Sequence, residues 1–168
     1  MSLSMYPASA PCFARALRNL SAILDKAQAH CTERKIDPLV LTGARLYPDM
    51  LPFTRQITIA CDNAKGAVAR LAGVENPKHD DTEKSFDELK QRIARTLEFI
   101  AGVKPEQIDG SEQRDVTLKL GGRDVHFKGQ DYLFGFALPN FYFHVVTAYA
   151  ILRHNGVPLG KTDYLGSP

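Results

Sequence analysis

The sequence has 168 residues, which is enough for one domain with its own hydrophobic core, and 24% of them are charged. Its 21 basic residues, set against 19 acidic ones, are scattered along the chain, so nothing suggests a nucleic-acid partner. No stretch reaches the roughly 18 consecutive apolar residues of a membrane span. The three cysteines, Cys12, Cys31 and Cys61, form no CxxC pair, which indicates reduced thiols. We therefore expect a cytoplasmic protein, with no membrane partner, that forms a single domain over residues 1–168.

The first half of the chain predicts two amphipathic helices separated by a long connection. The first helix begins near Ser9, and the polar connection runs from Thr32 to about Pro48. The second helix begins at Asp49, a favoured N-cap residue, and ends at Gly73. Both have apolar residues spaced alternately by three and four, the pattern of a helix packed lengthwise on others. These residues are Phe13, Leu17, Leu20, Leu24, Ala27 and Cys31 in the first helix, and Met50, Phe53, Ile57, Ala60, Ala64, Ala67 and Leu71 in the second.

A third helix is predicted from about Thr82 to Ala101. Asp81 or Thr82 can cap it, and Ser85 and Glu88 have the spacing of a capping box. Its apolar stripe consists of Phe86, Leu89, Ile93, Leu97 and Ile100.

Residues 116–128 change to a period of two. Val116–Leu120 and Arg123–Lys128 each alternate apolar and polar residues, and Gly121 and Gly122 lie between them. This pattern predicts a β-hairpin. Two strands alone are marginally stable, so the apolar residues of the hairpin should rest on the helices. They are Val116, Leu118, Leu120, Val125 and Phe127.

The fourth helix is predicted from about Asp131 to Asn155, and Pro139 should bend or break it locally. It is apolar on most sides, which indicates burial among several neighbours. It has more aromatic residues than one stripe can use, so some should line a pocket or an interface, and we expect a homodimer. Its stripe consists of Phe134, Leu138, Phe141, Val145, Ala148 and Leu152.

The fourth helix also carries the candidate site. Asn140 and His144 are four residues apart on one flank, the spacing by which a helix presents two ligands to a metal ion. The alternative is that His144 forms a hydrogen bond to another buried residue, because buried polar groups need partners. Gln56 could point into the same cavity or toward water. Asp49 is sufficiently explained as an N-cap.

Four segments resemble one family. They are residues 45–50 (RLYPDM), 138–144 (LPNFYFH), 148–153 (AYAILR) and 156–166 (GVPLGKTDYLG). With them the chain resembles the DinB/YfiT-like superfamily of four-helix bundles, in a subfamily of unknown function. The resemblance implies an up-down-down-up bundle with one long crossover. It also implies a divalent metal held by three histidines, one on the second helix and an HxxxH pair on the fourth, in metal-dependent thiol transferases or isomerases.

Carried over to this sequence, the second histidine of the pair is His144, and the first position holds Asn140. The histidine of the second helix falls near Gln56, with Asp49 as a less favoured substitute. Two of the three histidines are therefore replaced. Neutral amide oxygens compensate poorly for dehydration of the ion, so such a degenerate site would bind zinc or nickel only weakly.

These observations predict an all-α, DinB-like, up-down-down-up four-helix bundle with a small β-hairpin between its third and fourth helices. The expected function is small-molecule binding in a cavity beside His144, Asn140 and Gln56. One alternative is a metal-dependent transferase or hydrolase that uses His144, and another is a non-enzymatic dimeric interaction module. A metal-free enzyme with His144 as general base would need an acidic partner for that residue.

Overall fold

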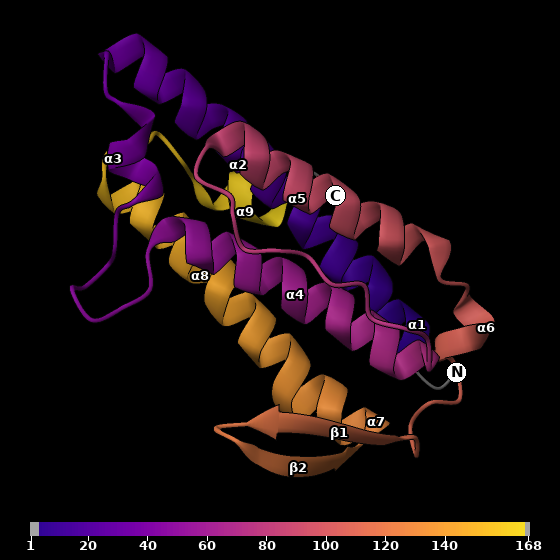
Figure 1. Cartoon of the computed structure of the whole chain (residues 1–168). Coiled ribbons are helices and arrows are strands. Elements are labelled where there is room, and N and C mark those ends of the chain that lie inside the picture. The colour runs from indigo at the N-terminus through magenta and orange to yellow at the C-terminus, as the bar shows by residue number, and fades with distance from the viewer. Residues whose placement is uncertain (1–3, 167–168) are drawn as a thin grey trace.

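The computed structural model describes residues 4–166, and its four longest helices form a bundle (Figure 1). These helices are α2 (Ala10–Arg34), α4 (Phe53–Ala72), α5 (Phe86–Gly102) and α8 (Leu138–His154). Within the described residues, five short helices accompany them: α1 (Met5–Ala8), α3 (Pro38–Thr42), α6 (Pro105–Ile108), α7 (Gly129–Tyr132) and α9 (Lys161–Leu165).

Side-chain contacts give the directions of the long helices. The rings of Phe53 and Phe86 meet edge-on near the starts of α4 and α5, and Asp62 pairs with Arg92 further along both helices. These two helices are therefore parallel, and α2 and α8 run the opposite way (Figure 1). The order is up-down-down-up, as the resemblance implied. Because consecutive parallel helices need a return segment, residues 73–85 cross back alongside α4 (Figure 1).

The predicted apolar stripes form most of the core. Phe13 and Phe141 pack edge-on between α2 and α8 with their ring centroids 4.9 Å apart, and both are fully buried. Leu97 and Leu138 are partly buried against this core. Phe134 was predicted to belong to the core, and this was wrong, because 45% of its surface is exposed.

The exposure of Phe134 has a local cause. The predicted fourth helix is a continuous run in which a π-helix, η1 (Leu133–Ala137), lies between α7 and α8. Pro139 has no amide hydrogen to donate to the carbonyl of Gly135, and its ring would collide with that carbonyl in an α-helix. The wider π turn accommodates the proline and rotates Phe134 away from the stripe that follows. The bend or break predicted at Pro139 takes the form of a π turn within a continuous helical run, not of a break.

The run Gly129–His154 is long and apolar enough, by length and composition alone, to cross a membrane. Its apolar character has another explanation in the bundle. α8 packs along α4 and also against α2, so it has several neighbours to bury its surface against.

The second and third helices both begin later than predicted. α4 starts at Phe53 with Pro52 as its N-cap, because the amide of Phe53 donates to the carbonyl of Ala44 at 2.8 Å and closes a loop over residues 44–52. Asp49 is exposed in this loop and is not the N-cap.

α5 starts at Phe86, not near Thr82. Ser85 caps it through the predicted capping box with Glu88. Asp81 is not a cap, because its carboxylate pairs with Arg55 and Arg92 instead.

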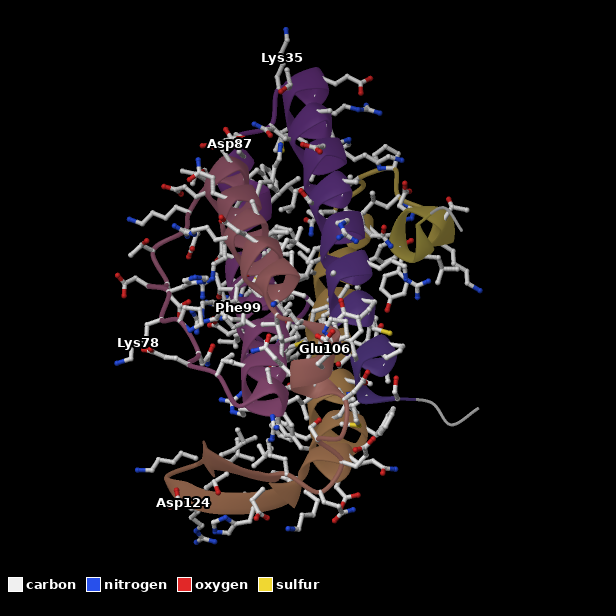
Figure 2. All side chains as sticks on the ribbon, turned by 90° about the vertical axis from the view of Figure 1, so that its right-hand side faces the viewer. Lys35, Lys78, Asp87, Phe99, Glu106 and Asp124 are labelled. Atoms are coloured by element: carbon white, nitrogen blue, oxygen red, sulfur yellow. The ribbon has the colours of Figure 1, made fainter. Side chains whose placement is uncertain are left out.

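The β-hairpin has the predicted strands, β1 (Asp115–Leu120) and β2 (Arg123–Lys128), with Leu120 opposite Arg123 across the turn. Gly121 and Gly122 have φ of 56° and 81°, a region that favours glycine. Figure 2 shows the hairpin, which carries Asp124, across the end of the bundle opposite Lys35. Val116 and Leu118 are buried as expected, whereas Leu120 is exposed.

Candidate functional site

His144 is buried in the contact between α8 and α4, and its partner is Gln56. The two side chains meet at 2.7 Å between His144 Nδ1 and Gln56 Oε1. Gln56 Nε2 donates to the carbonyl of Leu51 at 2.9 Å, so its Oε1 is the acceptor and His144 Nδ1 carries the proton. Burial lowers the pKa of His144, which keeps the imidazole uncharged at neutral pH with a lone pair on Nε2.

Asn140 lies one turn earlier on α8 and reaches a different residue of α4. Its Nδ2 donates to Oδ1 of Asn63 at 2.9 Å, and Asn63 Nδ2 donates to the carbonyl of Ile59 at 3.0 Å. This leaves Asn140 Oδ1 as an acceptor with no hydrogen bond from residues 4–166. The structure thus brings His144 to Gln56 and Asn140 to Asn63, as two neighbouring pairs across one helix contact.

Asp49 does not join these pairs. It is exposed in the loop over residues 44–52, whose carbonyls of Leu51 and Pro52 accept from the side chain and the backbone amide of Gln56. Asp49 is therefore not a ligand candidate, although it precedes α4 in the sequence.

The residues present do not fit a zinc or nickel ion. Structural and catalytic zinc sites use imidazole, thiolate and carboxylate ligands, and this set offers one imidazole and neutral amides. The amide oxygen of Gln56 already accepts from His144, and the amide nitrogen of Asn140 donates to Asn63. Within residues 4–166, no three His, Cys, Asp or Glu side chains are grouped to hold a metal ion. The partner of His144 is also neutral, so it lacks the acidic group that a general-base role was expected to need.

A polar cleft of about 480 Å³ opens beside Asn140, between α4, the π-helix region and the hairpin. Gln56 and His144 do not line it. Its walls combine amide, guanidinium and carboxylate groups with leucine and aromatic side chains. The lining residues are Ile59, Asp62, Asn63, Arg70, Leu118, Lys119, Leu120, Tyr132, Phe136 and Asn140.

Arg70 is a charged group of this cleft that a neighbouring aromatic residue holds. Its Nη1 donates to the hydroxyl of Tyr132 at 3.1 Å, and its guanidinium carbon lies 5.9 Å from the centre of the Tyr132 ring. Burial raises the pKa of Tyr132, and the nearby guanidinium opposes this. The phenol is therefore neutral at physiological pH and holds Arg70 in place.

A second cleft, of about 550 Å³, lies between the crossover and α5. Val74, Pro77, Phe99 and Val103 make it mostly apolar, and it contains none of the sequence-predicted site residues. Figure 2 shows Lys78 of the crossover and Phe99 of α5 on this side of the bundle.

The sequence interpretation missed a buried charged cluster on the other flank of α4. Arg92 is fully buried and binds Asp62 at 2.9 Å, Glu83 at 3.1 Å and the carbonyl of Asp80 at 2.9 Å. Lys65, only 3% exposed, donates to the carbonyl of Pro77 in the same crossover. A charged residue next to an apolar stripe position, as Arg92 is to Ile93, was the one signal available.

The sequence model of a domain of unknown function, DUF1993, matches residues 5–165. A crystal structure of a DinB family member protein from Shewanella denitrificans is similar, with a TM-score of 0.88 and 41% sequence identity. The match covers 97% of this chain and 92% of that one. No curated protein matches the chain.

Proposed function

We propose that this chain, which belongs to the family of the domain of unknown function DUF1993, binds a small molecule in the polar cleft beside Asn140. The observation that carries the proposal is the cleft itself, with a fixed guanidinium at Arg70 and an open acceptor at Asn140 Oδ1. A volume of about 480 Å³ falls in the range of small-molecule sites, which combine apolar walls with a few placed polar groups.

The π-helix supports the same location. Single π turns inside α-helices are often found at functional sites, and this one places Phe136 in the wall of the cleft. Tyr132, which holds Arg70, immediately precedes it.

A fragment screen by two-dimensional NMR on the full ¹⁵N-labelled chain tests the proposal. Fragments should shift resonances of Asn63, Arg70 and Asn140, and Asn140→Leu should abolish these shifts because it removes the acceptor and fills space. His154→Leu, on the exposed end of the same helix, is the control and should bind as the wild type does. Fragments that gather instead around Phe99, in the second cleft, would overturn the proposal.

A second candidate, a dimeric interaction module, is favoured by exposed apolar residues near His144. Phe143 is 55% exposed, Val146 47% and Leu51 44%. Phe143 and Val146 share one face of α8, and a second copy of the chain would bury them. Light scattering tests this: the wild type should have the mass of a dimer, and Phe143→Asp the mass of a monomer. Phe134→Asp, at another exposed aromatic residue, should remain a dimer, and a monomeric wild type contradicts the candidate.

The cysteines are consistent with the cytoplasmic location that we also propose. Cys31 and Cys61 are buried free thiols, and burial raises the pKa of Cys61 to about 12. Neither needs an oxidising compartment for the fold. Fractionation of the native cells should recover the protein with cytoplasmic markers, and recovery with membranes contradicts this location.

A further inference from the structure

Among the described residues, Arg70 has no anionic partner, unlike the partly buried Arg55 and the fully buried Arg92, which pair with carboxylates. Arg114, which is also partly buried, has no carboxylate partner in this part of the chain either, but it donates to the backbone carbonyls of Leu71 and Gln107. Within residues 4–166, no carboxylate forms a salt bridge with Arg70. Asp62 also lines the cleft, but its carboxylate is already bound by Arg92 at 2.9 Å and by Lys65 at 3.3 Å.

The guanidinium of Arg70 is held in position by its surroundings. A Cβ atom at Gly66 would lie 2.5 Å from Arg70 Nη1, so the guanidinium occupies space that only glycine leaves free. The hydroxyl of Tyr132 accepts from the same nitrogen. A guanidinium has five N–H donors, so most of them remain available to a group in the cleft.

The remaining walls define what such a group could be attached to. Phe136 and Leu118 offer apolar surface, and Asn140 Oδ1 can accept a hydrogen bond. Lys119 adds a second positive charge at the rim, where it is exposed. The cleft is therefore complementary to an anion at Arg70 and to an apolar body that carries a hydrogen-bond donor.

We propose that the ligand of this cleft is a small carboxylic acid whose carboxylate binds Arg70. A planar guanidinium fixed at one nitrogen can present two parallel N–H groups to the two carboxylate oxygens. The apolar body then lies against Phe136 and Leu118. This inference rests on the proposed function, because it concerns the ligand class of the same cleft.

The alternative role for Arg70 is purely structural. It lies in the last turn of α4, where a cation complements the helix dipole. Arg34 holds the equivalent place in the last turn of α2 and is exposed. It therefore provides a matched control for the loss of one positive charge at a helix end.

Phenylacetate and phenylacetamide test the inference as probes, because they share shape and differ in charge. In NMR titrations of the full chain, phenylacetate should bind the cleft about tenfold more tightly than phenylacetamide, the difference expected from a charge-assisted hydrogen bond. Arg70→Gln should remove this preference, and Arg34→Gln should keep it.

A second variant moves the guanidinium without removing its charge. Gly66→Ala introduces the Cβ that would crowd Arg70 Nη1, and alanine favours a helix, so the variant should fold. It should lose the preference for phenylacetate. Gly102→Ala, where a Cβ meets open space, should not.

The outcomes separate the two proposals. Equal binding of both probes in the cleft, unchanged in Arg70→Gln, overturns the carboxylate inference and leaves the proposed function standing. Phenylacetate that shifts no cleft resonance up to its solubility limit, while other fragments do, overturns the inference alone. If no fragment of any charge binds there, both proposals fail.

Discussion

The two flanks of α4 bury polar groups in different ways. On the flank toward α5, Arg92 and Lys65 are charged, and their donors are directed at the crossover. On the flank toward α8, the groups are neutral amides and one uncharged imidazole, in the Gln56–His144 and Asn63–Asn140 pairs. Buried charges without partners are costly. The charged groups of the α5 flank therefore need one another, and their role is to stabilise the fold. The neutral flank leaves Asn140 Oδ1 as an open acceptor in a cleft, which supports the binding proposed there.

The largest loss of stability is expected for a substitution in the charged flank. Arg92→Leu should lower the free energy of unfolding by about 3–5 kcal/mol, because it leaves the buried Glu83 without its main partner. Urea denaturation measures this. Arg95→Leu is the control: its side chain is 54% exposed and pairs with the same carboxylate, so the loss should stay below about 1 kcal/mol. Similar losses in both variants would remove the special role of Arg92.

A smaller effect is expected on the neutral flank. His144→Ala should cost about 1–3 kcal/mol, because Gln56 Oε1 loses its buried donor. The exposed His154→Ala should change the free energy of unfolding by less than about 0.5 kcal/mol. If His144→Ala were as neutral as its control, the hydrogen bond to Gln56 would not contribute to the helix contact.

The smallest effect concerns pH. Burial lowers the pKa of His144 from its ordinary value of 6.5, so the unfolded chain binds this proton more tightly than the folded one. Stability from this residue is therefore complete above about pH 6.5 and falls as the pH drops toward the lowered folded value. His79, whose pKa burial also lowers, acts in the same direction.

Denaturation curves between neutral and mildly acidic pH measure this effect. His144→Gln should reduce the acid-induced loss of stability, and combining it with His79→Gln should reduce the loss further. A double variant that is as acid-sensitive as the wild type would show that other groups govern this range.

The sequence was sufficient for the features that depend on local periodicity. The four apolar stripes, the glycine turn of the hairpin and the helix irregularity before Pro139 all follow from spacing or from one residue's backbone chemistry. The late start of α4 did not follow, because it depends on a hydrogen bond from Phe53 to Ala44 across a closed loop. Local residue types contain no information about that closure.

The site was predictable only in part for a similar reason. Helical spacing placed Asn140 and His144 on one flank, and the resemblance suggested Gln56 as a third member. Which residue of α4 each one contacts depends on how far the two helices are shifted along each other. Asn140 lies one turn before His144 on α8, and there it contacts Asn63 and not Gln56. The role of Arg70 depends on Gly66 and on Tyr132, which lies 62 residues away in sequence.

The central claim is that the neutral flank of α4 binds without a metal ion, and calorimetric titration with zinc tests it most directly. The wild type should show weak binding or none, because His144 is the one imidazole among the three positions of the set and amides occupy the other two. The double variant Gln56→His, Asn140→His restores the three-histidine set and should bind zinc at least about a hundredfold more tightly. Wild-type protein that binds one zinc ion per chain as tightly as the double variant, and loses it in His144→Ala, would contradict the account.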